Sequence, residues 1–192
     1  MTKVIGISGG IGAGKSIVCK VLQKWGFCVF DCDREAKALM DDDDDIKEQI
    51  CHNISTEAVC GNIIDRKRLA EIVFGDKEKL KILNNIVHSA VRQKFASWLE
   101  KHYSERIVFV ESAILHSSGM NNDIDLEWRI IASDETRISR VKIRNGLNTD
   151  QIKARIKAQE VDKASRAHVY IENDGKKPLL PQLAKILHDT LN

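Results

Sequence analysis

The stretch that decides the fold is Gly9-Gly-Ile-Gly-Ala-Gly-Lys-Ser16, near the start of a chain of 192 residues. It fits the pattern G-x-x-x-x-G-K-[ST], in which glycines let successive backbone N–H groups point into one concavity that can hold phosphate. The apolar run at residues 3–8 precedes it, and an apolar stripe at helical spacing follows it up to Trp25. This strand–loop–helix context is the one the motif requires, and it disfavours a chance glycine-rich turn.

The residues of this loop have separate expected tasks. Lys15 would reach the β- and γ-phosphates of a nucleotide, and the Ser16 hydroxyl would bind Mg²⁺. The helix that begins there adds its partial positive charge to the phosphate site. The loop therefore predicts ATP and Mg²⁺ as cofactors, with a nucleotide-binding set of Gly10, Ile11, Gly12, Ala13, Gly14, Lys15, Ser16 and Ile17.

The composition narrows the class of protein. With 43% hydrophobic residues, 30% charged residues and only 2 prolines, the chain is neither disordered nor of low complexity. A net charge of +2 gives the protein no strong overall positive potential that would attract nucleic acid, so we expect no nucleic-acid partner. The sequence lacks an apolar run near the roughly 20 residues that span a bilayer. The first expected strand follows Met1 almost at once, which leaves no signal peptide, and the five cysteines form no CxxC pair. We expect a cytoplasmic protein with reduced thiols and no membrane association.

Strands and helices alternate on both sides of a long helical segment. Further strands are expected at residues 27–31, 106–111, 126–133 and 168–172, with helices from Ser133 or Asp134 to Asn145, from Thr149 or Asp150, and after Pro178 and Pro181. This alternation predicts an α/β fold, a three-layer P-loop NTPase core whose mainly parallel sheet is covered on both faces.

Residues 33 to about 103 lack a convincing strand and carry helical periodicity at 65–74 and 76–103, where Asp65 and Asp76 suit N-caps. We therefore expect a helical insertion in the core. The predicted parts are a nucleotide-binding core (1–38 and 106–192), a helical substrate-binding insertion (39–105) and a helical lid (137–162) within the core.

Acidic residues follow two of the expected strands. Asp33 comes after the second strand, on the sheet edge where the phosphate loop lies, so it can face the γ-phosphate and accept the proton of an acceptor hydroxyl. The alternative for Asp31 and Asp33 is N-capping of the next helix, and Asp31 would otherwise support Asp33. Glu111 sits where a Walker B acid would act on Mg²⁺ through water, or else it is a solvated strand end.

A basic helical segment follows in the last third of the chain. Arg137, Arg140 and Arg144 lie at i, i+3 and i+7 and so share one helix face, and Arg155 follows on the next helix. Such helices suit a lid whose arginines stabilise a transferring phosphoryl group and exclude water. The alternatives are a solvated basic face, or nucleic-acid binding, which the lack of interleaved aromatics disfavours.

The acidic run Asp41–Asp45 is not expected to form a functional site. Five adjacent acids would repel one another, so we expect a solvated loop that leads into a helix at Ile46 and not a metal site.

These motifs and several further segments make the chain resemble the dephospho-CoA kinase family over essentially its whole length. The resemblance rests on the segments Ile7–Ser16, Gly26–Asp33, Ile64–Leu69 with Val73-Phe74, the spacing of Arg137, Arg140 and Arg144, the spacing of Gln151, Arg155 and Gln159, and Asn173 near the expected adenine site. Departures are Ile17 for the family's Thr, Ser89 for the Pro that follows His88, and Glu111-Ser-Ala-Ile-Leu-His116 for its usual Asp-x-Pro-Leu-Leu-Phe. The changed turn weakens any role carried over to it.

The resemblance implies phosphorylation by ATP of the ribose 3′-hydroxyl of dephospho-CoA, which gives coenzyme A and ADP in the last step of coenzyme A synthesis. It implies Asp33 as the catalytic base, Lys15 and Arg140 as groups that stabilise the phosphoryl group, and Arg144 and Asn173 in the ATP site. The insertion would hold dephospho-CoA, the small-molecule partner; His88 is a candidate contact there, or a buried structural histidine.

Two other functions stay open at this point. Another nucleoside or small-metabolite kinase would use the same loop, and only its acceptor would differ. A nucleotide-dependent switch is disfavoured because the guanine motif N-K-x-D is missing and the strand ending at Glu111 is not followed by D-x-x-G. The sequence leaves the oligomeric state undetermined.

Overall fold

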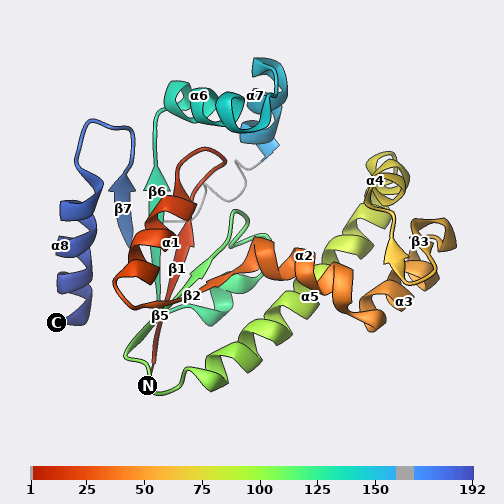
Figure 1. Ribbon diagram of the computed structural model, residues 1–192, viewed down its shortest axis with the longest axis horizontal. Helices are drawn as coiled ribbons and strands as arrows, with labels where there is room; N and C mark the ends of the chain where they lie inside the picture. The colour runs from red at the N-terminus through yellow and green to blue at the C-terminus, as the bar shows by residue number, and fades with distance from the viewer. Residues whose placement is uncertain (1, 159–166) are drawn as a thin grey trace. The chain divides into compact units, whose positions relative to one another are not determined.

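The computed structural model describes residues 2–158 and 167–192 (Figure 1). The chain divides into two compact units, Met1–Phe30 with His102–Asn192 and Asp31–Lys101, and each is described by itself. In the residues described, no helix is both long enough and apolar enough to cross a membrane.

The first unit is built on a five-stranded sheet. Its strands are β1 (Lys3–Ser8), β2 (Cys28–Asp31), β5 (Ile107–Glu111), β6 (Leu126–Ile131) and β7 (Val169–Glu172), in the spatial order β2-β5-β1-β6-β7. β1 pairs in parallel with both β5 and β6, and β6 pairs in parallel with β7. The predicted α/β fold with a parallel sheet is confirmed, and the phosphate-loop strand lies at its centre.

Two helices cover one face of this sheet. α1 (Lys15–Lys24) and α8 (Leu179–Leu191) lie along it in Figure 1. Ile5 of β1 and Trp128 of β6 are fully buried in a core with Leu22 of α1 and Leu183 of α8. Each such side chain contributes about 1.5–3 kcal/mol through burial.

The opposite face of the sheet receives the turn that follows β5. This turn includes the 3₁₀ helix η2 (Met120–Asp123). Leu115 and Ile124 approach Gly6 of β1 so closely that a β-carbon there would lie 2.9 and 2.8 Å from their side chains. The central strand is therefore covered on both faces within the first unit.

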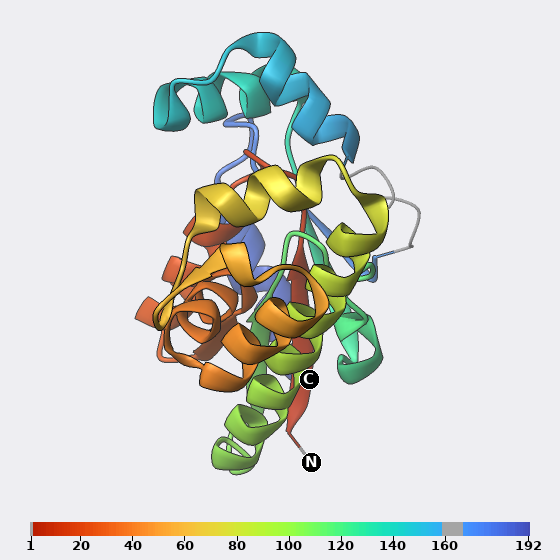
Figure 2. The ribbon, with the colours of Figure 1, turned by 90° about the vertical axis from the view of Figure 1, so that its right-hand side faces the viewer.

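Two more helices lie beyond the carboxyl ends of the strands, where Figures 1 and 2 both place α6 (Asp134–Asn145) beside α7 (Thr149–Ala158). The Ser133 side chain caps α6, and Gly146 ends that helix with φ 64°. Val141, Ile152 and Ile156 form a small core that also receives Ile11 of the phosphate loop. The end of the predicted lid, with Gln159, lies outside the described residues.

The second unit is mainly helical. It contains α2 (Cys32–Asp42), α3 (Asp44–Asn53), the 3₁₀ helix η1 (Thr56–Ala58), α4 (Arg66–Phe74) and the long α5 (Lys77–Lys101). Asp65 accepts hydrogen bonds from the N–H groups of Lys67 and Arg68, and Asp76 does the same for Glu78 and Lys79, so both predicted N-caps are confirmed. Its core includes Ile46, Ile50, Leu69 and Val73.

Two expectations for this unit were wrong. The segment does contain strands, β3 (Val59–Cys60) and β4 (Ile63–Ile64), which pair antiparallel around Gly61 with φ 60°. Strands of two residues are too short to show a period-two pattern.

The acidic run is not a loop either, since only Asp43 lies between α2 and α3. Asp43 accepts a hydrogen bond from the Ile46 N–H at 3.2 Å, and Asp41 forms an ion pair with Arg66 at 2.7 Å. The run therefore caps and anchors a junction between two helices.

Candidate active site

The loop Gly9–Ser16 adopts the backbone that its glycines allow. Gly12 and Gly14 have φ of 79° and 98°, in the left-handed region that favours glycine. Gly14 is the N-cap residue of α1, and among the described residues no side chain caps that helix. The first N–H groups of α1 are therefore available to an anion, which is the arrangement that binds phosphate.

The start of the loop lies tightly against β6. A β-carbon on Gly9 would lie 2.5 Å from the backbone oxygen of Ile130, and Gly9 has φ 143°. We expect Gly9→Ala to lower the free energy of unfolding by about 1–3 kcal/mol, because both the strained backbone and the clash must be accommodated. Urea denaturation of purified protein measures this loss.

Gly75 provides the matched control for this change. Its φ is −91°, and nothing lies within 4 Å of its hypothetical β-carbon. An equal effect of Gly9→Ala and Gly75→Ala on unfolding would contradict the tight packing described for the loop.

Lys15 and Glu111 meet at the carboxyl ends of neighbouring strands. The Lys15 Nζ donates a hydrogen bond to the Gly9 carbonyl at 3.0 Å and lies 3.6 Å from Glu111 Oε1. Both side chains are about nine-tenths buried, and Glu111 pairs in register with Ile7 at the end of β1. Glu111 is therefore not a solvated strand end, while Ser16 is exposed in the first turn of α1.

Two further predicted residues lie against the loop. Arg140 Nη1 donates to the carbonyls of Gly12 and Ala13, both at 3.3 Å, and Asn173 Nδ2 donates to the Ala13 carbonyl at 2.9 Å. Asn173 follows β7 directly, and its N–H donates to Ile131 O at 2.8 Å. Helix α6 thus brings Arg140 to the loop, and the end of β7 brings Asn173.

Arg137 has a contact that its sequence position did not reveal. Its side chain is 5% exposed; Nε donates to the Ile11 carbonyl at 3.0 Å, and Nη1 pairs with Asp134 at 3.0 Å. The spacing placed Arg137 and Arg140 on one helix face but did not show that this face meets the loop. Arg137 therefore links α6 to the phosphate loop through its hydrogen bond to the Ile11 carbonyl.

Arg144, Asp33 and Asp31 are described by their places in their own helices. Arg144 is exposed in the last turn of α6. Asp33 is exposed in the first turn of α2, in the second unit, two residues after the end of β2. Asp31 is the N-cap of α2 and accepts a hydrogen bond from the Arg34 N–H at 2.9 Å, so capping accounts for Asp31. The roles of Asp33 and Arg144 stay predictions.

His88 lies half-buried in α5. Burial, and secondarily the charge of Arg92, hold the pKa of its imidazole below the usual value, so His88 is mainly neutral at pH 7.

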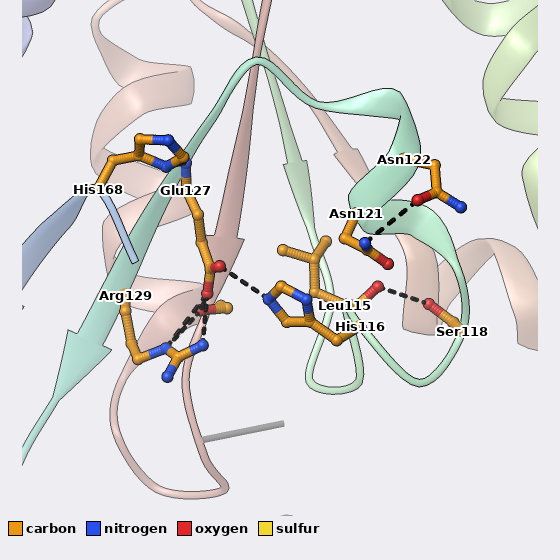
Figure 3. A network of polar contacts seen from close by, with 9 residues as sticks. Leu115, His116, Ser118, Asn121, Asn122, Glu127, Arg129 and His168 are labelled. Carbon is orange, nitrogen blue, oxygen red and sulfur yellow. Dashed lines mark hydrogen bonds and ion pairs between the residues drawn. The ribbon is translucent and has the colours of Figure 1, made fainter. Parts of the chain in front are cut away.

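Sequence reasoning missed a buried polar network next to the loop (Figure 3). The Glu127 carboxylate accepts hydrogen bonds from Ser8 Oγ, from Arg129 Nε and Nη2 at 3.2 and 2.8 Å, and from His116 Nε2 at 2.8 Å. Burial would raise the pKa of Glu127, but these hydrogen bonds hold it below the usual value. The available signal was the pair of charges in the otherwise apolar strand Leu126–Ile131.

The sequence and the structure were compared with those of known proteins, and both match dephospho-CoA kinases. The family model for dephospho-CoA kinase matches residues 3–178. A dephospho-CoA kinase of Bacteroides fragilis is 34% identical over 185 residues, which cover 95% of this chain and 90% of that protein. A crystal structure from Thermus thermophilus, at 35% identity, covers 99% of this chain and 96% of its own with a TM-score of 0.82. The dephospho-CoA kinase of Campylobacter jejuni, at 25% identity, gives a TM-score of 0.72 and covers 99% and 98%.

The matched region contains the whole phosphate loop, Lys15, Glu111, Arg140 and Asn173, together with the second unit. Similarity therefore extends through both units and is not confined to the widely shared loop. The chain belongs to the dephospho-CoA kinase family.

Proposed function

We propose that this protein transfers the γ-phosphoryl group of ATP to the ribose 3′-hydroxyl of dephospho-CoA. The observation that supports the proposal is the family match over residues 3–178. The matched region includes a loop with an uncapped helix start, where Lys15 bonds to the Gly9 carbonyl and Arg140 bonds to the Gly12 and Ala13 carbonyls. In the reaction the 3′-oxygen attacks the γ-phosphorus, the bond from that phosphorus to the β–γ bridging oxygen breaks, and ADP leaves.

The chain's own residues would supply positioning and charge. The loop from Gly10 to Ile17 would hold the phosphates through backbone N–H groups other than those of Ala13 and Ile17, which donate to Gly10 and Gly14. Lys15, released from the Gly9 carbonyl, would neutralise charge on the β- and γ-oxygens. Arg140 would stabilise the transferring group, and Arg144 and Asn173 would hold the nucleotide. Asp33 would accept the proton of the 3′-hydroxyl, and residues 39–105 would bind the acceptor.

The residues at the loop also fit Mg²⁺. Magnesium prefers oxygen ligands and usually keeps one or two protein groups together with substrate phosphates and water. The Ser16 hydroxyl and the Glu111 carboxylate are of this kind; Ser16 would be a direct ligand and Glu111 would act through water. When bound, the ion would neutralise charge on the β- and γ-phosphates.

A coupled ADP-release assay tests the proposed acceptor. We expect ATP turnover to require dephospho-CoA, because the family match extends through the second unit as well as the loop, and to stay near background with nucleosides or other small hydroxylated metabolites. Turnover with one of those acceptors but not with dephospho-CoA would identify a different small-molecule kinase. Slow hydrolysis with no acceptor requirement would identify a nucleotide switch.

A further inference from the structure

Arg137 of α6 contacts the first half of the phosphate loop, within the first unit. A β-carbon on Gly10 would lie 2.2 Å from its Nη2 and 2.9 Å from its Cζ, so the guanidinium group rests directly on Gly10. The Nε donates a hydrogen bond to the Ile11 carbonyl at 3.0 Å. A β-carbon on Gly12 would lie 2.6 Å from the backbone oxygen of Arg137. One residue of α6 therefore contacts three successive residues of the loop.

This contact leaves one donor of Arg137 unused. Nη1 pairs with Asp134, whose side chain is 63% exposed, whereas Nη2 is buried and has no hydrogen-bond partner among the described residues. A buried donor without an acceptor destabilises a fold, and an ion pair with an exposed carboxylate restores little of that stability. Stability therefore explains the packing of this guanidinium on Gly10 poorly, and a role in the function of the loop explains it better.

The hydrogen bond from Arg137 to the Ile11 carbonyl also fixes the direction of an N–H group. None of the described peptide bonds is cis, and in a planar trans peptide the C=O and the N–H point in opposite directions. The peptide unit that joins Ile11 to Gly12 therefore directs the Gly12 N–H away from Arg137. Within the described part of the chain no backbone carbonyl accepts from this N–H, whereas the Ala13 N–H donates to the Gly10 carbonyl at 3.1 Å.

We propose that Arg137 is a positioning residue for ATP, because its bond to the Ile11 carbonyl holds the Gly12 N–H in the orientation that meets a phosphate oxygen. The inference rests on the proposed function, in which this loop holds the phosphates of ATP. Arg137 acts through the backbone of the loop and does not itself contact the nucleotide. An N–H group that is already oriented loses less freedom when the phosphate binds, and this strengthens binding.

Calorimetric titration with ATP and Mg²⁺ tests this role without requiring turnover. We expect Arg137→Met to raise the Kd of ATP by about 10-fold, the effect of losing one hydrogen bond from a charged donor, and to leave the KM of dephospho-CoA nearly unchanged. In Arg137→Gln the amide nitrogen takes the place of Nε along the side chain and can donate to the Ile11 carbonyl. The Kd should then return to within about 3-fold of the wild-type value.

Two control variants on the same helix separate this bond from other effects. Lys142→Met removes an exposed positive charge from α6 and should leave the Kd of ATP unchanged. Asp134→Asn removes the ion pair to Nη1 but keeps the bond from Nε to the Ile11 carbonyl, so it should also leave the Kd unchanged.

Substitution of Gly10 tests the same contact from the loop and carries the test if Arg137→Met does not fold. Gly10 is not among the described glycines with positive φ, so its backbone suits alanine, but the added methyl group would displace the guanidinium. We expect Gly10→Ala to raise the Kd of ATP by about 10-fold. Gly10→Ala/Arg137→Gln should recover most of the affinity, because only the nitrogen in the place of Nε, 3.5 Å away, would remain near the methyl group.

Four results would overturn the inference. For Arg137 these are unchanged ATP affinity in Arg137→Met, or an equal loss in Arg137→Met and Arg137→Gln, which would assign the effect to the positive charge. For Gly10 these are an unchanged Kd in Gly10→Ala, or a loss that the added Arg137→Gln change does not relieve. Normal ATP binding by the wild-type protein without turnover of dephospho-CoA would instead overturn the proposed function.

Discussion

Asp33→Asn is expected to reduce turnover with ATP and dephospho-CoA by about 10²- to 10⁴-fold, the usual contribution of a general base. The amide keeps the size of the side chain but cannot take the proton of the 3′-hydroxyl. Because Asp33 is exposed in the first turn of α2 and does not cap that helix, the fold should persist. Stopped-flow kinetics measures the loss of turnover, and calorimetric titration with ATP shows whether the variant still binds the nucleotide.

The control for Asp33→Asn comes from the next helix. Asp45 is also exposed and occupies the second position of α3, as Asp33 does in α2, so Asp45→Asn removes an equivalent charge from a helix N-terminus. We expect Asp45→Asn to keep wild-type turnover. If Asp33→Asn also retained it, Asp33 would not be the base; a loss of ATP affinity in step with turnover would instead assign Asp33 to nucleotide binding.

Lys15→Met is expected to lower kcat by about 10²- to 10³-fold, because it removes a preorganised positive charge from the oxygens where charge develops. The ammonium group already lies at the loop, 3.0 Å from the Gly9 carbonyl and 3.6 Å from Glu111. The variant also leaves Glu111 without this cation in a buried position, so ATP affinity should fall as well. Single-turnover kinetics at saturating ATP separates the chemical step from binding.

Lys24→Met is the matched control for Lys15→Met, since Lys24 is the exposed last residue of the same helix. It should leave the single-turnover rate unchanged. A wild-type rate for Lys15→Met at saturating ATP would show that Lys15 serves binding alone, and it would remove this residue from the catalytic set.

Local patterns predicted the parts of the fold that local forces determine. The strand Lys3–Ser8, the loop and α1 followed from one motif and its flanking apolar residues. Asp65 and Asp76 were recognisable as caps because a cap needs only the next few N–H groups. The family, the α/β fold and the kinase assignment also agree with the comparisons.

Contacts between distant segments could not be predicted in this way. The Glu127 network joins Ser8 of β1, His116 of the turn that follows β5, and Arg129 of β6. Which charges meet in it depends on strand order and register, which no single segment encodes. Arg137 shows the same limit: its spacing identified the helix face, but its bond to the Ile11 carbonyl depends on where α6 lies.

The most direct test of the central claim is to locate the phosphate in the product. The wild-type protein is incubated with dephospho-CoA and ATP labelled with ¹⁸O in the γ-phosphoryl group, and the product is analysed by mass spectrometry and ³¹P NMR. The account predicts that the label appears in a new monoester on the ribose 3′-oxygen, in equal amount to the ADP formed. Label recovered only in inorganic phosphate, or on another hydroxyl group, would contradict it.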